Sequence, residues 1–380
     1  MSNGMPVIDI IFRQLAATAV ERSKRGILAV IIKDDTPGAD VASKKTYKRE
    51  DELDSKLYTA DNLKNIKRCF LVAVNKVVVI SIPTTAKFSA AIAILKMIKY
   101  NYVCTTDTAS QQELANYVIA FNASSPGKKV VALTWQVTTA DSKYIINLKN
   151  TTLTEIQTAE DGTKSNVAIP AVSYLPRIAA VLANLPLNRS ITYYVFEDLA
   201  EVDDVTTEEL DLDALVKAGW FFLWNDDDTV KAGRGVNTLT TYTSTDKEDM
   251  SSILIMESIN LMIEDIYNTF KNDYLGKYKN YLDNQKLFIA AVNSYFTEMS
   301  NEEILDPDYT GNDDLGTTGN QAFINVDAQR NAWIAVGKTK AADWSKAKVE
   351  SMTFKKKLFL AAGVKILDAM EDLNFVINME

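Results

Sequence analysis

The sequence contains no histidine among its 380 residues. Histidine is the commonest general base and the commonest metal-binding side chain in proteins. Its absence excludes Ser-His and Cys-His nucleophile systems and most zinc and iron sites. Chemistry by carboxylates or lysine remains possible, but no nucleophile, base and oxyanion donor can be assembled from the motifs present. We therefore expect no catalytic residue, no cofactor and no metal ion.

Cysteine is scarce, and long apolar segments are missing. Cys69 and Cys104 are far apart in the sequence and cannot form a disulfide framework. No stretch reaches the roughly 18 apolar residues that a membrane-spanning helix needs. The first residues, MSNGMPVIDIIFRQ, lack the basic and then apolar segments that are typical of a secretion signal. We expect a protein of a cytoplasm-like compartment with no membrane insertion.

Clustered positive charge is also missing. The formal net charge is −9 and the pI is about 4.9. Nucleic-acid binding requires clustered lysine and arginine, and the single basic run, Lys355-Lys356-Lys357, is short enough to be a solvated strand face. We expect no nucleic-acid partner. The remaining composition, 47% hydrophobic and 24% charged, is typical of a globular chain, and the length suffices for two domains.

One short segment is similar to the end of a phosphate-binding loop. Gly337-Lys338-Thr339 matches the last part of G-x-x-x-x-G-K-[ST]. The first glycine of that pattern lets the backbone N–H groups surround the phosphates. Ala332 stands there instead, followed by the bulky Trp333. The segment therefore argues against a nucleotide site.

Two acidic segments and a glycine pair have structural explanations. Asp306-Pro307-Asp308-Tyr309-Thr310-Gly311 is similar to the start of a calcium loop, but Thr317 takes the position of the bidentate glutamate. A solvated loop is the better interpretation, with weak ion binding left open. Asp226-Asp227-Asp228 lies between two strand-like runs and is typical of a hairpin tip. Gly233-Arg234-Gly235 is not a dinucleotide fingerprint, because it follows that hairpin and opens no helix.

The first two thirds of the chain show a β-α-β-α-β order. Continuous apolar runs predict buried parallel strands, and segments with apolar residues three or four apart predict the helices between them. This order predicts an open, mostly parallel α/β sheet over residues 26–245. The predicted strands include Ile27–Ile32, Val77–Ile82, Tyr102–Cys104, Val130–Trp135 and Tyr144–Leu148.

After about residue 246 the pattern becomes helical. Apolar periodicity predicts helices over Met250–Phe270 and Leu282–Met299, and two strands over Lys357–Leu367 and Leu373–Ile377. We therefore expect a C-terminal α+β domain with extended strand arms at both ends of the chain. The expected boundaries are an N-terminal arm at 1–25, the core at 26–245, a helical part at 246–350, and C-terminal strands with an arm at 351–380.

Both ends of the chain contain strand-forming apolar residues where soft polar sequence is usual. A terminal strand must pair with something, so these residues are candidates for contacts with another subunit. The candidate interface residues are Val7, Ile8, Ile10, Phe12, Leu358, Leu360, Val364, Ile366, Leu373, Phe375, Val376 and Ile377.

The segment WFFLWNDDDTVKAGRGVNTLTTYT, residues 220–243, carries a family resemblance. An apolar strand, an acidic turn, a second strand and a G-R-G-V-N-T-L-T run, followed by a long helix, resemble the contractile phage tail sheath family. That family serves phages and R-type phage-tail-like bacteriocins, and the chain is similar to its compact Gram-positive members. Larger members insert extra domains before the core. Only the polar segment 33–66 stands at that place here, which indicates a minimal sheath.

The resemblance implies a structural polymer and no enzyme. Family members stack as hexameric rings around an inner tail tube, exchange terminal strands between subunits, and contract to drive the tube through a bacterial envelope. Implied partners are further copies of the chain, the inner tube protein, and baseplate and tail terminator proteins. The resemblance also implies that the protein assembles in the cytoplasm of a bacterial host and is a component of a virion tail or phage-tail-like particle. Two alternatives remain: an α/β nucleotide-binding enzyme, and a non-contractile scaffold or adhesin module.

Overall fold

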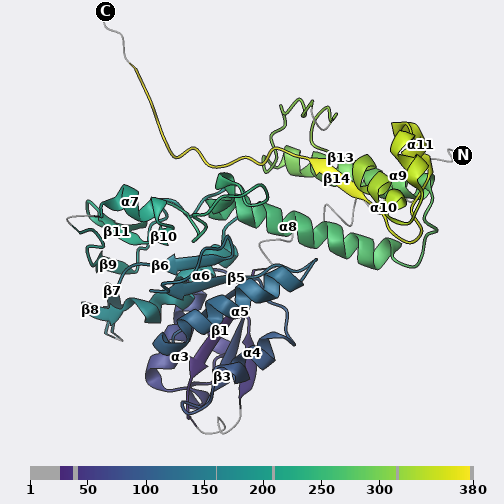
Figure 1. The fold of residues 1–380 in the computed structure, drawn as a ribbon. Helices are drawn as coiled ribbons and strands as arrows, with labels where there is room; N and C mark the ends of the chain where they lie inside the picture. Colours follow the sequence, from purple (N-terminus) through teal and green to yellow (C-terminus); the bar gives the residue numbers. More distant parts are fainter. Residues whose placement is uncertain (1–25, 37–41, 160, 208–209, 314–315, 377–380) are drawn as a thin grey trace, which may run out of the picture. The chain divides into compact units, whose positions relative to one another are not determined.

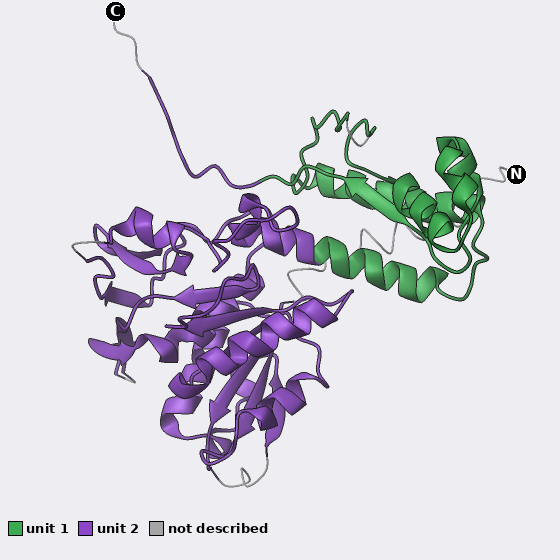
Figure 2. Ribbon diagram, viewed as in Figure 1, with its two compact units in different colours: residues 1–20, 261–367 green, residues 21–260, 368–380 purple. Residues whose placement is uncertain are grey.

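The computed structural model describes residues 26–36, 42–159, 161–207, 210–313 and 316–376. The described chain forms two compact units, shown in separate colours in Figure 2. We call residues 26–260 together with 368–376 the core unit, and residues 261–367 the helical unit. The boundary between them falls inside one long helix, α8 (Ile253–Thr269).

The core unit is built on a seven-stranded sheet with the order β10-β6-β5-β4-β1-β3-β2. Every neighbouring pair in this sheet is parallel except β2 with β3. The expected open and mostly parallel α/β sheet is therefore confirmed. Its strands are β1 (Ile27–Lys33), β2 (Ser43–Tyr47), β3 (Lys76–Ile82), β4 (Tyr102–Thr105), β5 (Val131–Trp135), β6 (Ile145–Leu148) and β10 (Trp220–Phe221).

Helices cover both faces of this sheet (Figure 1). Alternate residues of β1 enter two different apolar clusters, because successive strand side chains point to opposite faces. Leu28, Val30 and Ile32 pack in the cluster that contains residues of α3 and α6. Ile27, Ala29 and Ile31 pack in the cluster that contains residues of α4 and α5. The four helices are α3 (Ala60–Lys67), α4 (Ser89–Leu95), α5 (Gln111–Ser124) and α6 (Leu175–Asn184).

The strand β2 lies inside the segment that the sequence marks only as polar. Its sequence is SKKTY, and Lys44 and Lys45 are exposed. It pairs antiparallel with β3 at the edge of the sheet. Charged side chains on an edge strand discourage pairing with another chain, so this edge is protected.

Two smaller sheets complete the core unit. The first contains β7 (Thr152–Thr158), β8 (Lys164–Pro170) and β9 (Leu199–Val202), with β7 in the middle. The second is the hairpin of β11 (Leu223–Asp226) and β12 (Thr229–Ala232), which follows α7 (Leu212–Lys217). The predicted hairpin is thus confirmed, and Asp227 at its tip has the left-handed φ of 51° that turn residues of this kind adopt.

A buried ion pair joins β7 to the helical layer of the core unit. Arg68 donates through Nε and Nη2 to the two carboxylate oxygens of Glu155, at 2.6 and 2.9 Å. Arg68 also donates to Asn65 Oδ1 at 2.6 Å and to the Ser173 carbonyl at 3.1 Å. This fork-to-fork pairing satisfies both charges, which burial otherwise makes costly.

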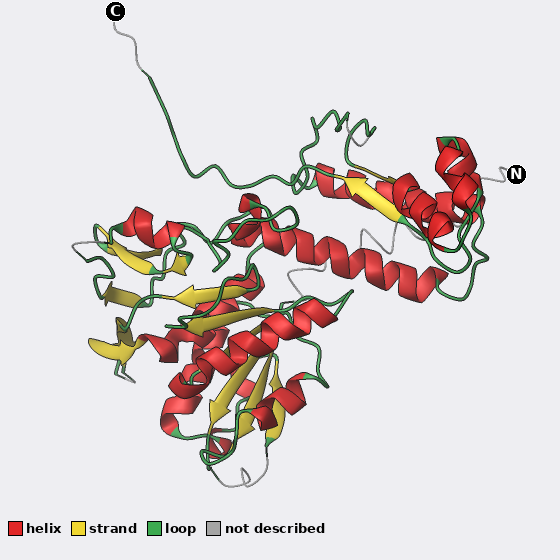
Figure 3. Ribbon diagram, in the orientation of Figure 1, coloured by secondary structure: helices red, strands yellow, loops and turns green. Residues whose placement is uncertain are grey.

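The helical unit contains the remaining helices and a two-stranded sheet (Figure 3). The helices predicted over Met250–Phe270 and Leu282–Met299 are confirmed as α8 and α9 (Leu282–Asn301). A π-helical turn, η7 (Phe270–Tyr274), ends α8. The other elements are β13 (Gln321–Ile324), α10 (Val326–Ala335), α11 (Lys346–Ser351) and β14 (Leu360–Gly363).

The two predicted terminal strands differ from the structure. The first is shorter than Lys357–Leu367, because its partner β13 has only four residues, Gln321 to Ile324. The second forms no strand over residues 373–376, the part of it that is described. The short 3-10 helices are η1 (Glu50–Glu52), η2 (Ser55–Leu57), η3 (Arg68–Leu71), η4 (Thr108–Ser110), η5 (Ala171–Tyr174), η6 (Glu248–Ser251) and η8 (Thr339–Asp343).

Candidate subunit interface

The sheet of the helical unit has two strands, and their hydrogen bonds define two different outer edges. β13 and β14 run antiparallel with Ile324 opposite Leu360 and Ala322 opposite Ala362. The neighbouring pair is hydrogen-bonded, because the Asn325 N–H donates to the Phe359 carbonyl at 2.9 Å. Bonded and non-bonded pairs alternate along antiparallel strands. The backbone groups of Leu360 and Ala362 therefore point away from β13.

The outer edge of β13 is occupied by a side chain. The backbone N–H of Ala322 donates to Oδ1 of Asn293 in α9 at 2.7 Å. Ala322 and Ile324 are both buried. The outer edge of β14 is different, since Ala362 is exposed and no other strand of the described chain pairs with β14. An additional strand would therefore find β14 the accessible edge.

Four of the apolar residues predicted for a subunit interface lie together at this edge. Leu360 belongs to β14, Leu358 precedes it, and Val364 and Ile366 follow it. All four are half-buried in the helical unit. Ile366 also forms an antiparallel bridge with Leu305. The structure thus groups these four around one strand and its flanks.

Three other predicted interface residues that the structure describes do not join that group. Leu373, Phe375 and Val376 belong to the core unit and are 89%, 74% and 73% exposed. Burying a side chain of this kind contributes roughly 1.5–3 kcal/mol, so the single chain leaves that energy unused. Contiguous exposed apolar residues mark contact sites. Val7, Ile8, Ile10, Phe12 and Ile377 lie outside the described residues.

The place where α/β sheets usually bind ligands is occupied by internal hydrogen bonds. Ligands bind beyond the carboxyl ends of the strands, where the strand order reverses. Here β1 is followed by Asp34, which is buried and accepts hydrogen bonds from the Thr59 N–H and from Asn62 Nδ2, both at 2.8 Å. Asp35 accepts from the Thr84 N–H at 2.8 Å. Two carboxylates at this edge make it unsuited to phosphate groups.

Asp34 stays ionised because of these contacts. Burial by itself would raise the pKa of this carboxyl group. Hydrogen bonds from Thr36, Asn62 and Thr59 outweigh that effect and lower the pKa below its ordinary value. The group therefore serves as a fixed acceptor that ties the end of β1 to the start of α3, a structural role.

The two ligand-like segments also have structural roles. Gly337 follows the end of α10, whereas a phosphate-binding loop precedes a helix, so the geometry is wrong for a nucleotide. Asp306 is paired with Lys365 Nζ at 2.8 Å, and the hydrogen bond from Lys365 lowers the pKa of Asp306. Among the described residues, no group of three acidic or cysteine side chains is arranged to hold a metal ion.

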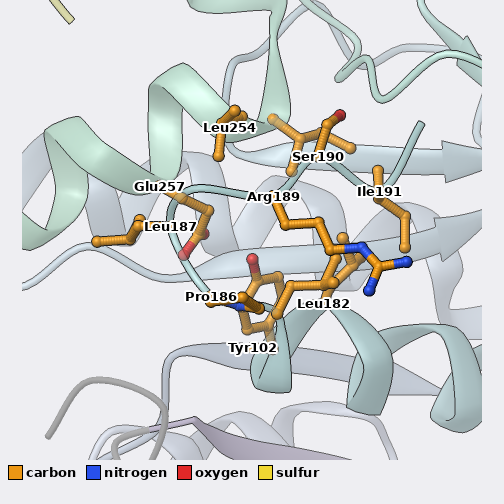
Figure 4. A pocket seen from close by; sticks show the side chains of 11 residues that line it. Tyr102, Leu182, Pro186, Leu187, Arg189, Ser190, Ile191, Leu254 and Glu257 are labelled. Atoms are coloured by element: carbon orange, nitrogen blue, oxygen red, sulfur yellow. The ribbon is translucent and has the colours of Figure 1, made fainter. Parts of the chain in front are cut away.

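A small cavity lies in the core unit between α6 and the start of α8 (Figure 4). Its volume is about 20 Å³. A single water molecule needs roughly 10–15 Å³ measured in this way, so an organic ligand does not fit. Leu182, Pro186, Leu187 and Leu254 surround it (Figure 4). In the described part of the chain, no helix is long and apolar enough to cross a membrane.

Comparison with known proteins identifies relatives along the whole chain. Residues 245–380 match the family model of the phage tail sheath C-terminal domain. The chain is 30% identical over 391 residues to the tail sheath protein of Clostridium phage phiCD119, and the aligned region covers 99% of each protein. Identity at this level over the full length establishes common family membership.

Solved structures share the fold at low sequence identity. The sheath tail protein Lin1278 from Listeria innocua matches with a TM-score of 0.64 and 12% identity, covering 84% of this chain and 93% of that one. The contracted helical sheath of the anti-feeding prophage matches with a TM-score of 0.66 and 11% identity, covering 94% of each. The contracted PVC sheath of an extracellular contractile injection system matches with a TM-score of 0.61 and 12% identity, covering 93% of this chain and 92% of that one. The chain belongs to the phage tail sheath protein family and is a structural subunit of a contractile phage tail or phage-tail-like particle.

Proposed function

We propose that this chain polymerises as stacked hexameric rings around an inner tail tube, and that contraction of the polymer drives the tube through a bacterial envelope. The observation that supports this most directly is that one chain has both an unpaired sheet edge and an exposed apolar segment. The sheet of the helical unit has an accessible edge at β14, and residues 373–376, the last that the structure describes, have exposed apolar side chains and form no strand. The β14 edge can accept a strand, and the apolar C-terminal segment can supply one.

Strand addition between subunits would satisfy both features. An incoming strand takes the outward N–H and C=O groups of Leu360 and Ala362 into hydrogen bonds and buries its own apolar side chains. The proposed donors are the terminal segments around Val7–Phe12 and Leu373–Ile377 of neighbouring subunits. The proposed acceptor residues beside β14 are Leu358, Leu360, Val364 and Ile366. Such exchange links neighbouring subunits through backbone hydrogen bonds between strands. These hydrogen bonds can stay intact while the subunits rotate during contraction.

The proposed division of labour follows the chain order. Residues 1–25 form an arm, residues 26–245 form the core domain, residues 246–350 form the helical part that faces the tube, and residues 351–380 supply strands and the second arm. Exposed side chains near the end of α8 support the tube-facing role of the helical part. These are Tyr267, Leu275, Tyr278 and Tyr281. Exposed aromatic residues are enriched in protein interfaces.

The proposed partners are further copies of the chain, the tube protein, the baseplate and the tail terminator, with assembly in the cytoplasm of a bacterial host. A fold relative supports the baseplate contact, because it forms part of the anti-feeding prophage baseplate structure. Such contacts use the same strand edges at the end of the polymer, where one partner subunit is replaced by another protein.

Deletion of residues 373–380 tests this proposal. The full-length protein should form long hollow tubes in negative-stain electron microscopy. The truncated protein should nearly keep its thermal unfolding temperature, because Leu373, Phe375 and Val376 are largely exposed within the single chain. It should form no tubes. Regular tubes from the truncated protein would refute strand donation by the C-terminal residues, and a non-assembling full-length protein would refute polymerisation.

A further inference from the structure

The Gly233-Arg234-Gly235 segment is held tightly in the core unit. A Cβ atom on Gly233 would stand 2.6 Å from the ring of Phe222. A Cβ atom on Gly235 would stand 2.8 Å from Ile191 Cγ2, and the Gly235 N–H donates to Thr192 Oγ1 at 2.8 Å. Both glycines are therefore required by close packing. The backbone between them is fixed, and Arg234 projects from a rigid position.

The next residues of the motif are used in internal contacts. Asn237 Nδ2 donates to the Met250 carbonyl at 2.7 Å, which connects the motif to the turn before α8. Thr238 Oγ1 donates to the Ser142 carbonyl at 3.0 Å, and the Thr238 N–H donates to the Ile145 carbonyl of β6. These contacts explain why asparagine and threonine stand in the motif. They leave the side chain of Arg234 for another role.

Arg234 binds two carboxylates from the far end of the chain. Its Nε donates to Glu371 Oε2 at 2.7 Å and its Nη2 donates to Asp372 Oδ2 at 2.5 Å. These hydrogen bonds, that of Asp372 first, raise the pKa of Arg234. Ser190 Oγ donates to Glu371 Oε1 at 3.1 Å, and Ser252 Oγ donates to Asp368 Oδ1 at 3.2 Å. The planar guanidinium fork is suited to such paired recognition.

The bound segment forms one wall of an open groove in the core unit. The groove has a volume of about 830 Å³, and its lining includes residues 234–237, Glu248, Asp249, Ser251, Ser252 and residues 368–373. Lys217 adds a second positive charge, while Glu248 and Asp249 are acidic. Because those two acids repel carboxylates, the position of the segment is set by Arg234. Beyond Asp372 the chain has exposed apolar side chains.

We propose that Arg234, together with Ser190 and Ser252, forms a binding site for an acidic extended peptide, and that its occupant is the chain's own segment Asp368–Asp372. The contacts hold the segment in cis and fix the point at which Leu373 leaves the core unit. Fixing that point reduces the conformational entropy that the apolar end loses when it pairs with a neighbour. This last step rests on the proposed strand donation, whereas the binding site itself does not.

Distance measurements between two spin labels test the site. Labels are placed at Asp213→Cys in α7 and at Asn374→Cys, both at exposed positions. The native Cys69 and Cys104 are buried and do not react. The labelled chain is mixed with an excess of unlabelled chain, so that only distances within one chain are measured. The doubly labelled chain with an unchanged Arg234 should give one narrow distribution of distances between the two labels.

Arg234→Gln should replace this narrow distribution with a broad one. Glu371→Gln with Asp372→Asn should have the same effect from the other side of the contact. Arg234→Glu combined with Glu371→Arg and Asp372→Arg should restore the narrow distribution. Raised salt should broaden the wild-type distribution, because Arg234 is 39% exposed and the pairing is screened. Arg49→Gln, which removes an exposed arginine paired with Asp51, is the matched control and should change nothing.

Three results would overturn the inference. The first is a broad distance distribution in the wild type, and the second is a narrow distribution in Arg234→Gln. The third is a narrow wild-type distribution that disappears on dilution with unlabelled chain, because it would mean that Arg234 binds the segment of a neighbouring subunit. Electron microscopy of the same samples separates this inference from the proposed function. Absent tubes with a narrow distribution would refute polymerisation alone. Tubes with an unchanged Arg234→Gln distribution would refute the binding site alone.

Discussion

The backbone N–H of Ala322 in β13 donates to Oδ1 of Asn293 in α9 at 2.7 Å. An asparagine side chain thereby occupies the position that a third strand would take on that side of the sheet. At the opposite edge, formed by Leu360 and Ala362 of β14, no further strand of the described residues is paired, and Ala362 is exposed. The asymmetry between the two edges decides where a strand from another subunit is expected to add.

Ala362→Pro tests the β14 edge. The N–H of Ala362 points away from β13, so proline removes no bond within the sheet but blocks a strand on the outer side. We expect loss of tubes in electron microscopy, with the free energy of unfolding changed by less than about 1 kcal/mol.

The neighbouring alanine supplies the control. The N–H of Ala361 points toward β13, so Ala361→Pro removes a hydrogen bond of the sheet and should cost about 1–3 kcal/mol of stability in chemical denaturation. Tubes of normal appearance from Ala362→Pro would show that β14 is not the acceptor edge. Equal destabilisation by both substitutions would show that the hydrogen-bond directions are assigned wrongly.

Asn293→Ala should destabilise the helical unit. It leaves the buried N–H of Ala322 without its acceptor, which costs about 1–3 kcal/mol. Asn293→Asp keeps an acceptor oxygen and should recover most of that stability. Urea denaturation of both variants, followed by tryptophan fluorescence, measures the difference. Equal losses for the alanine and aspartate variants would mean that the hydrogen bond contributes little.

Several elements of the fold follow from local sequence, and others depend on partners far away in the chain. The apolar run of β1 predicts a strand buried on both faces, and Asp226-Asp227-Asp228 predicts a hairpin tip; both agree with the structure. The polar strand β2 has no apolar pattern, because it lies at an edge, and the sequence gives no signal for it. Its pairing is determined by β3.

In the candidate interface, too, some features follow from local sequence and others depend on distant parts of the chain. Apolar residues such as Leu360 and Leu373 are visible in the sequence as interface candidates. The direction of the β14 backbone and the contact from Asn293 are not, because they depend on register and on the packing of α9. Arg234 stands in a motif that the sequence displays, but its partner Glu371 is 137 residues away, and charge alone does not select that pair.

The buried pair of Arg68 and Glu155 should make the core unit sensitive to acid. Burial on its own would raise the pKa of Glu155, but hydrogen bonds from Arg68 and then its charge lower it below the ordinary value of 4.5. The folded state thus holds the carboxylate ionised where the unfolded chain binds a proton. The resulting stability is fully present above pH 4.5 and is lost as the pH falls toward the lowered folded pKa.

Glu155→Gln measures this contribution. At neutral pH the variant should lose about 3–5 kcal/mol, because Arg68 is left buried with an unpaired charge. Its stability should then fall less steeply than that of the wild type between neutral pH and pH 3, as measured by urea denaturation. Parallel pH profiles for the two proteins would show that Glu155 does not titrate differently in the folded and unfolded states.

Substitution of Ile8, Ile10 and Phe12 together by aspartate tests the N-terminal arm. Charges on a donated strand cannot be buried in a neighbour's sheet, so assembly into tubes should be abolished. The thermal unfolding temperature of the core should stay within a few degrees of the wild-type value, because a donated arm packs outside its own domain. A matched change of Arg13, Gln14 and Glu21 to serine should leave assembly intact. A large fall in the unfolding temperature would mean that these apolar residues pack against their own chain.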